Sequence, residues 1–203
     1  MSSANARTPA SGPRLDPREP LVLDTRELPR RAGSMRPLSR TVPAPSRLGL
    51  ELLSVPEGSD IALDLRLEAV VEGVLVSGRA SMSVAGECGR CLDPVSDELV
   101  VDLQQLYVYA DSEVPEDEDT GRLVGDLLDL EPALRDAVVL ALPLTPLCDP
   151  DCAGLCADCG QRLDDLPENH GHETADPRWA ALTALQSAGE ADPDTKESPR
   201  GRS

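Results

Sequence analysis

Aromatic residues are almost absent from this sequence of 203 residues, which has no Phe, one Trp and two Tyr. Leu, Val and Ala must therefore supply the hydrophobic core, and these side chains bury less area than aromatic ones do. With 40% hydrophobic residues, the chain can build one domain with a core and substantial tails. A core of this modest kind favours a metal ion as an additional cross-link.

The sequence also lacks a long apolar segment. No stretch approaches the roughly 20 apolar residues that span a membrane, and residues 1–20 contain no apolar signal-peptide core. We therefore expect a cytoplasmic protein. Because cytoplasmic thiols are kept reduced, the six cysteines are better interpreted as metal ligands than as three disulfides.

Sequence motifs of common enzyme classes are missing as well. The chain contains no phosphate-binding Gly-x-x-x-x-Gly-Lys, no dinucleotide-binding Gly-x-Gly-x-x-Gly and no His-Glu-x-x-His. The many Asp and Glu residues are explained by a solvated surface. We therefore predict a protein that is not an enzyme, with no catalytic residues and no organic cofactor.

Basic residues are scarce, with 19 Lys and Arg against 37 Asp and Glu and a net charge of −18. The first 48 residues hold nine Arg against four acids, a net of +5, so the remaining 155 residues carry −23. An acidic body repels the phosphate backbone of nucleic acids. The Arg-rich N-terminal region is thus the only candidate for contact with RNA, and its simpler interpretation is a solvated lead-in segment.

The two ends of the chain are polar and show no hydrophobic period. Residues 1–19 and 187–203 are predicted to be disordered tails, the first of them basic. Between them we predict a single domain over residues 20–186. Within it, residues 111–121 should form a flexible acidic loop, and the Pro- and Arg-rich residues 29–45 an irregular crossing.

Alternation of apolar and polar residues predicts the strands. Residues 61–68 and 74–84 alternate with a period of two and are separated by a turn at Gly73, which indicates a hairpin. Residues 95–109 predict a third long strand, and residues 20–24 a short one.

Two segments predict helices. Residues 131–142 place Pro in the first turn and apolar residues at helical spacing, and prolines follow this segment. Residues 176–185 predict a short C-terminal helix that carries the single Trp. The expected fold is α+β: an antiparallel sheet or partial barrel with one central helix, a zinc-knuckle segment and a short C-terminal helix.

The cysteines are spaced as zinc ligands often are. Cys88/Cys91 and Cys156/Cys159 are both Cys-x-x-Cys pairs, in which one tight turn can aim two thiolates at a tetrahedral zinc ion. One such pair is a weak signal, but two pairs beside a further Cys-x-x-x-Cys are a strong one. We therefore predict structural zinc, with the first pair in a turn between two strands.

Six thiols exceed the four ligands that one zinc ion needs, so several ligand sets remain open. The first choice is Cys88, Cys91, Cys156 and Cys159. A second set replaces the last pair with Cys148 and Cys152, and a third lets residues 148–159 bind alone. His170 and His172 could supply nitrogen but lie in a polar stretch, where they are interpreted as surface residues.

Two rival interpretations of the cysteines are weaker. Buried metal-free thiols are disfavoured because Gly, Asp, Pro and Arg flank the cysteines. A redox dithiol needs its nucleophilic Cys at the start of a helix. Neither Cys91, followed by Leu-Asp-Pro, nor the pair Cys156/Cys159 precedes a convincing helix.

Four segments together resemble the YceD family of bacteria and plastids, and the resemblance covers about residues 20–186. The Cys-x-Arg-Cys-Leu and Gly-Leu-Cys-x-x-Cys-Gly motifs are its most specific parts. The segments are Gly73-Val-Leu-Val-Ser-Gly78, Gly86-Glu-Cys-Gly-Arg-Cys-Leu-Asp-Pro94, Cys152-Ala-Gly-Leu-Cys-Ala-Asp-Cys-Gly160 and Asp176-Pro-Arg-Trp-Ala-Ala-Leu182.

This resemblance implies a ribosome-biogenesis factor that supports synthesis, processing or stability of large-subunit (23S) ribosomal RNA. Some relatives keep the first cysteine pair and ligand-like residues near Cys148 and Cys152 while lacking Cys156/Cys159, which favours the second ligand set. Because the acidic, aromatic-poor body suits RNA poorly, we expect action through a protein partner, such as a basic ribosomal protein or an RNA-processing factor. The alternatives are a zinc-dependent regulatory adaptor and a thiol redox enzyme.

Overall fold

The computed structural model describes residues 14–112 and 120–172. The chain divides after Leu155 into two compact units, Met1–Leu155 and Cys156–Ser203. The predicted domain boundaries, with one domain over residues 20–186 between two tails, stay a prediction.

Three long strands form the centre of the first unit. Strands β5 (Asp60–Ala69), β6 (Gly73–Glu87) and β7 (Pro94–Val108) follow one another as an antiparallel meander. β7 pairs with β6 along its whole length, from Gly73 opposite Val108 to Glu87 opposite Pro94. The alternating pattern of the sequence predicted these three strands, because one face of each is buried and the other is exposed.

The Pro- and Arg-rich stretch predicted as an irregular crossing contains a strand instead. Residues Met35–Pro43 form β2, which pairs antiparallel with β5 and lies at the end of the strand order β2–β5–β6. An edge position accommodates Pro37 and Pro43, because a proline there need not donate to a further strand. The predicted crossing was therefore wrong for these nine residues.

Short strands extend the sheet. β4 (Leu53–Val55) pairs with the end of β6 and with β3 (Leu48–Gly49). β8 (Thr120–Arg122) pairs in parallel with β7, so the sheet is not purely antiparallel, and the last residues of the predicted acidic loop 111–121 belong to a strand. Residues 113–119 of that loop lie outside the described residues.

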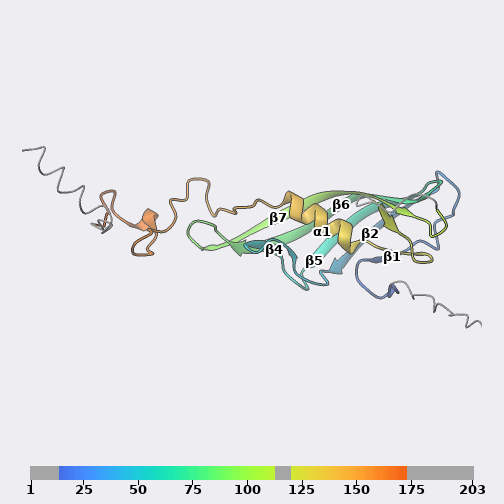
Figure 1. The fold of residues 1–203 in the computed structure, drawn as a ribbon, viewed down its shortest axis with the longest axis horizontal. Coiled ribbons are helices and arrows are strands. Elements are labelled where there is room, and N and C mark those ends of the chain that lie inside the picture. Colours follow the sequence, from blue (N-terminus) through green and yellow to red (C-terminus); the bar gives the residue numbers. More distant parts are fainter. Residues whose placement is uncertain (1–13, 113–119, 173–203) are drawn as a thin grey trace, which may run out of the picture. The chain divides into compact units, whose positions relative to one another are not determined.

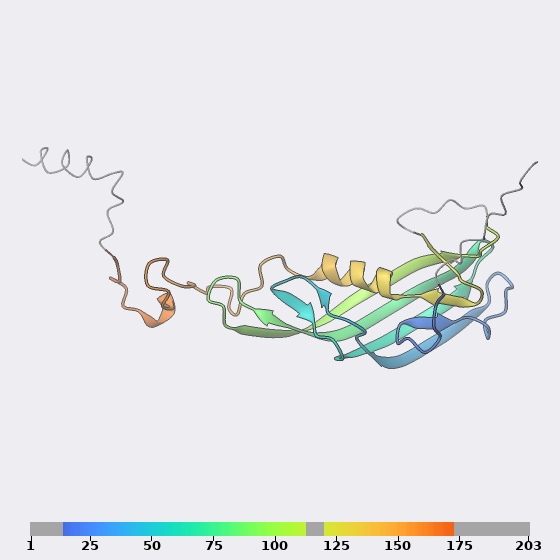
Figure 2. The same cartoon turned by 60° about the horizontal axis from the view of Figure 1, so that its bottom comes forward.

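A two-stranded ribbon and one helix pack with the sheet. β1 (Val22–Asp24) pairs antiparallel with β9 (Leu127–Asp129), and α1 (Glu131–Ala141) follows β9 directly. Leu23, Leu128 and Leu134 from these elements join the buried side chains of β5, β6 and β7 in one hydrophobic cluster. Figures 1 and 2 show α1 lying along the sheet. The central helix was predicted within one residue of its observed end.

The observed architecture is α+β in outline, mostly sheet with a single α-helix in the described residues. The sheet does not close into a barrel within residues 14–112 and 120–155. No helix of the described residues is long and apolar enough to cross a membrane.

The second unit has little regular structure in its described part, residues 156–172. It contains the 3-10 helix η1 (Leu163–Asp165). The predicted C-terminal helix over residues 176–185 and the predicted tail over residues 187–203 lie outside the described residues, as do residues 1–13 of the N-terminal tail.

Candidate metal centres

The first candidate centre begins in the turn between β6 and β7. Cys88 and Cys91 are both buried in this turn. The backbone N–H of Cys88 donates to the carbonyl of Asp93 (2.8 Å), and that of Leu92 donates to the carbonyl of Cys88 (3.0 Å). Leu92, which follows Cys91 in the turn, has a positive φ of 64°, a conformation that is uncommon for residues other than glycine.

The segment after α1 supplies two more thiols. Cys148 is exposed and Cys152 is buried. The backbone N–H of Gly89 donates to the carbonyl of Pro146 (2.8 Å), and the guanidinium of Arg90 donates to the carbonyl of Cys152 (2.8 Å). These two bonds hold the β6–β7 turn against the segment that follows the helix.

The four thiols have the spacing of a tetrahedral metal site. Their sulfur atoms all lie within 4.8 Å of one another. The Sγ–Sγ distance is 3.9 Å from Cys88 to Cys152 and 3.4 Å from Cys91 to Cys148. Four thiolates about 2.3 Å from a shared zinc ion would lie about 3.8 Å apart. Four-thiolate geometry of this kind fits a metal ion, and the residues present could hold one.

The surroundings of these thiols favour one thiolate before a metal binds. Backbone N–H groups of Cys91 and Arg90 lower the pKa of Cys88 from 9.0 to about 6, and the N–H of Arg90 lies 3.4 Å from the Cys88 sulfur. The backbone N–H of Asp93 lowers the pKa of Cys91, but burial and the thiols of Cys148 and Cys88 raise it to about 12. A dication would favour ionisation of all four thiols, because it places two positive charges among the four sulfur atoms.

A second candidate centre lies in the second unit. Its four ligand atoms, all within 4.8 Å of one another, belong to Cys156, Cys159, His170 and His172. The Cys159 sulfur is 3.6 Å from Nε2 of His170, and the two histidine Nε2 atoms are 3.0 Å apart. Backbone N–H groups of Cys159 and Asp158, with the His170 side chain, lower the pKa of Cys156 to about 6.

The structure therefore groups the predicted ligands differently from the first choice. It brings Cys88 and Cys91 together with Cys148 and Cys152, which is the second predicted set. Cys156 and Cys159 of the first choice gather in their own unit with the two histidines. Which of these residues bind metal stays a prediction.

The sequence interpretation placed both histidines at the surface and left them as possible nitrogen ligands, and metal binding by them stays a prediction. His172 is exposed and His170 half-buried, yet both lie beside thiols. A local signal was present, because His-x-His follows Cys-x-x-Cys after a spacer of ten residues. Pairs of cysteines and histidines at such short separations are typical of zinc sites.

Comparison with known proteins gives several relatives. Residues 76–186 match the family model "Large ribosomal RNA subunit accumulation protein YceD". An uncharacterized protein of Mycobacterium tuberculosis is 46% identical over 169 residues, which cover 82% of this chain and 81% of that protein. A Mycobacterium leprae protein is 44% identical over 82% of this chain and 77% of its own length.

A more distant relative is YlbN of Bacillus subtilis, 24% identical over 57% of this chain and 75% of that protein. No solved structure matches the chain. The family model spans more than half of the sequence, and the mycobacterial relatives are similar over most of it. This chain therefore belongs to the YceD family, whose members are described as large ribosomal RNA subunit accumulation proteins.

Proposed function

We propose that this protein is a non-enzymatic ribosome-biogenesis factor that supports the synthesis, processing or stability of large-subunit (23S) ribosomal RNA through contacts with another protein. The observation that carries the proposal is the match of residues 76–186 to a family described by accumulation of that RNA. The family description names an RNA whose level changes and no chemical reaction. A cytoplasmic location, where ribosomes are assembled, is part of the proposal.

The exposed face of the sheet supports a protein partner. We call the alternate, outward-facing residues of β2, β5, β6 and β7 the outer face; the hydrophobic cluster lies behind the other face. Two of its charged residues are basic, Arg66 and Arg79, and Arg79 pairs with Asp102 at 3.1 Å. Its six acids are Asp60, Asp64, Glu68, Glu87, Glu98 and Asp102.

An acidic surface of this kind selects its partner by charge. Carboxylates repel phosphates, so nucleic acid gains little from docking there. A basic protein gains attraction and a faster encounter, and unlike charges fix its orientation. We therefore assign the outer face as the docking surface for a basic ribosomal protein or a basic RNA-processing factor.

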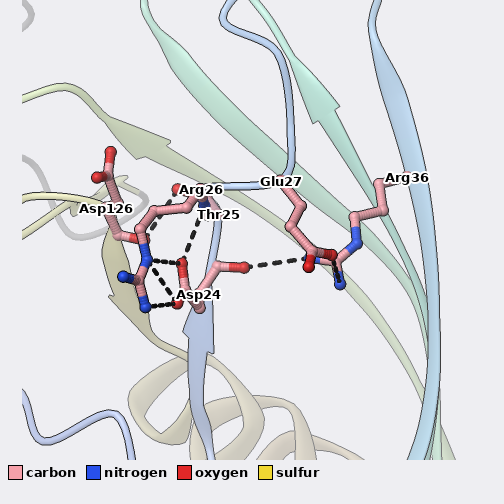
Figure 3. A network of polar contacts seen from close by, with 6 residues as sticks. All are labelled: Asp24, Thr25, Arg26, Glu27, Arg36 and Asp126. Carbon is pink, nitrogen blue, oxygen red and sulfur yellow. Dashed lines mark hydrogen bonds and ion pairs between the residues drawn. The ribbon is translucent and has the colours of Figure 1, made fainter.

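The arginines of the N-terminal region bear on the same question. Several of these arginines make ion pairs or hydrogen bonds within the first unit, so their guanidinium groups are already engaged and less available to RNA. Arg26 pairs with Asp24, Arg36 pairs with Glu27 at 2.6 Å, and Figure 3 shows both contacts. Arg40 donates to the carbonyl of Pro20 at 2.6 Å. The contacts of Arg36 and Arg40 hold the β1 region to the sheet, whereas the Arg26–Asp24 pair is local, and all three support a structural role for these arginines.

Zinc is the metal that we propose for the first centre, with Cys88, Cys91, Cys148 and Cys152 as ligands. Thiolates are soft ligands that favour zinc over magnesium or calcium. The ion would cross-link the β6–β7 turn to the segment after α1, across 57 to 64 residues of sequence. Its role is structural, because four thiolates leave no open coordination position.

Depletion of the protein in its own cells tests the ribosomal role. We expect the ratio of 23S to 16S ribosomal RNA to fall on depletion and to recover with the wild-type gene. Recovery should be impaired by the outer-face variant Asp64→Asn/Glu68→Gln/Glu98→Gln, because it removes three charges from the docking surface. The matched control Glu57→Gln/Glu72→Gln/Asp111→Asn, whose acids are exposed outside the long strands, should restore the ratio. An unchanged ratio after full depletion would refute the ribosomal role.

Filter binding of the purified protein to fragments of 23S RNA tests whether its partner is a protein and not the RNA itself. We expect weak binding at physiological salt. Deleting residues 1–48 would remove β1 and β2, so the variant to compare is Arg14→Gln/Arg18→Gln/Arg31→Gln, which changes three exposed arginines. Tight binding by the wild type, whether or not this variant weakens it, would contradict action through protein contacts.

A further inference from the structure

The second unit gathers four metal-ligating side chains that the first centre does not use. Cys156 and Cys159 come from one tight turn, and His170 and His172 from the end of the described segment. The ribosomal proposal neither requires nor explains them. Their arrangement raises the question of whether the chain binds one metal ion or two.

The distances between the ligand atoms match a tetrahedral zinc site with mixed ligands. With zinc about 2.3 Å from sulfur and about 2.05 Å from nitrogen, a sulfur and a nitrogen ligand lie about 3.6 Å apart and two nitrogens about 3.3 Å apart. The observed distances are 3.6 Å from the Cys159 sulfur to the His170 Nε2 and 3.0 Å between the two Nε2 atoms. Both observed distances differ by no more than about 0.3 Å from those expected for ligands that share one zinc ion.

The backbone shapes the turn around the two thiols. The N–H of Gly160 donates to the carbonyl of Cys156 (2.9 Å), and the N–H of Cys156 donates to the carbonyl of Gln161 (2.8 Å). Gly160 has a φ of 69°, which a residue with a Cβ adopts at a cost. This is the tight Cys-x-x-Cys-Gly turn in which both sulfur atoms can face one ion.

The histidines are positioned as separate ligands. The N–H of His170 donates to the carbonyl of Pro167 (2.8 Å), which closes a turn just before the pair. The two rings are nearly perpendicular, with an interplanar angle of 85° and centroids 4.6 Å apart. Their Nε2 atoms approach one another, while two neutral acceptor nitrogens would repel unless a proton or a metal ion lay between them.

Burial of apolar side chains does not explain the conformation of the described part of this unit. None of residues 156–172 is buried, so this segment has no hydrophobic core of its own. A segment of about this size without buried apolar area needs a cross-link or a metal to hold one structure. Metal binding supplies folding free energy directly in small domains of this kind.

We propose that Cys156, Cys159, His170 and His172 form a second structural zinc site, which folds residues 156–172 independently of the four-thiolate centre. Two thiolates and two neutral imidazoles neutralise the charge of Zn²⁺, so the site suits a segment that is largely open to solvent. The chain then binds two zinc ions of different ligand chemistry. A metal-free pair of thiol–imidazole and imidazole–imidazole hydrogen bonds is the rival explanation.

Metal analysis of the full-length protein tests the proposal. The wild type, purified reduced and dialysed against zinc-free buffer, should retain two zinc ions per chain. The double variant His170→Gln/His172→Gln should retain one, and Cys88→Ser/Cys91→Ser should lose the other. Glu168→Gln, an exposed neighbour of the histidines, is the matched control and should retain two.

Cobalt substitution reports the ligand type at each site and does not depend on how firmly zinc is retained. Co²⁺ in the His170→Gln/His172→Gln protein should show the strong sulfur-to-metal charge transfer of four thiolates. Co²⁺ in Cys88→Ser/Cys91→Ser should show about half that intensity, because the remaining site has two thiolates. A wild-type stoichiometry of one ion, or two ions that the histidine variant leaves unchanged, would overturn the proposal.

Discussion

In the folded protein the less exposed of two thiols, Cys156, has the lower pKa, and the more exposed one, Cys148, has the higher. Cys156 is half-buried and Cys148 exposed. Backbone N–H groups of Cys159 and Asp158 hold the pKa of Cys156 at about 6. The hydrogen bond with Cys91 lowers the pKa of Cys148, but burial and the thiols of Cys152 and Cys88 outweigh it, so this pKa lies above 9.0. The thiolate fraction at neutral pH is therefore large for Cys156 and very small for Cys148.

The pKa of Cys156 gives a test of metal-dependent folding. While residues 156–172 keep the described conformation, the rate at which iodoacetamide modifies Cys156 should reach half its maximum near pH 6, because hydrogen bonds lower the pKa of this thiol. In metal-free, reduced protein we expect that conformation to be lost, so half of the maximal rate should be reached close to the ordinary thiol pKa of 9.0. Mass spectrometry of the Cys156 peptide measures the rate as a function of pH. A half-maximal rate near pH 6 in the metal-free protein would contradict metal-dependent folding of this segment.

Gly154 is a residue at which a side chain should disturb the first centre. Its φ is 83°, and an added Cβ would lie 3.2 Å from the Cβ and the carbonyl oxygen of Arg90. Gly58 has a similar φ of 77°, and a Cβ added there would have no atom within 4 Å. It therefore measures the cost of the backbone conformation alone. Gly58→Ala should cost about 1 to 2 kcal/mol of unfolding free energy, and Gly154→Ala should cost more because Arg90 must also move.

Urea unfolding of both glycine variants measures this difference. Gly154→Ala should in addition weaken zinc retention by the first centre, because Arg90 donates to the carbonyl of Cys152. Gly58→Ala should leave zinc retention unchanged. Equal losses of stability in the two variants would mean that the contact with Arg90 carries no energy.

At this scale the sequence identified the cysteines as possible metal ligands but left several ligand sets open. Cys88 and Cys152 are 64 residues apart, and their distance depends on the length of the β6–β7 hairpin and on where α1 ends. Neither quantity follows from cysteine spacing. For the histidines the sequence could not decide between ligands and surface residues, since a polar segment gives no hydrophobic signal that would distinguish the two.

Among the elements, the strands with one buried face were predicted well. β5 alternates buried and exposed residues over its full length, and a strand with one buried face produces this period of two in the sequence. β2 escaped prediction because its outward positions hold Pro37 and Pro43, and its inward positions include Arg36 and Arg40. Those arginines donate to backbone carbonyls of the β1 region, an interaction that has no periodic signature.

Two leucines of helix α1, one buried and one exposed, allow the contribution of helix packing to the free energy of unfolding to be measured. Leu134 is fully buried in the hydrophobic cluster, whereas Leu140 is 86% exposed on the same helix. Leu134→Ala should lower the free energy of unfolding by about 2 to 5 kcal/mol, and Leu140→Ala should change it by less than about 0.5 kcal/mol.

Urea denaturation followed by circular dichroism measures both helix variants. The Leu134→Ala protein should also lose zinc from the first centre more readily, because Cys148 and Cys152 follow directly from this helix. A loss below 1 kcal/mol for Leu134→Ala would mean that α1 contributes little to the core.

Across the whole molecule, stability is distributed unequally between the two units. The first has a continuous core built from Leu, Val, Ile, Ala, one Met and one buried Tyr. This Tyr107 donates its hydroxyl to the carbonyl of Asp129 (2.9 Å). This core forms with few aromatic residues, because many aliphatic side chains on three long strands and one helix bury their apolar area together. The described part of the second unit contributes no residue to the hydrophobic clusters.

Removal of metal should therefore affect the two units differently. After treatment with a strong chelator, the amides of β5, β6 and β7 should keep their protection from hydrogen exchange, because the hydrophobic cluster persists without zinc. Amides of residues 156–172 should exchange as fast as an unfolded chain, since this segment has no buried apolar core and its few backbone hydrogen bonds and surface ion pairs are weak without the metal. Exchange followed by mass spectrometry measures both regions in one sample, and restored zinc should restore protection. Retained protection in residues 156–172 after chelation would contradict metal-dependent folding, and loss of protection in the three strands would show that the core itself depends on metal.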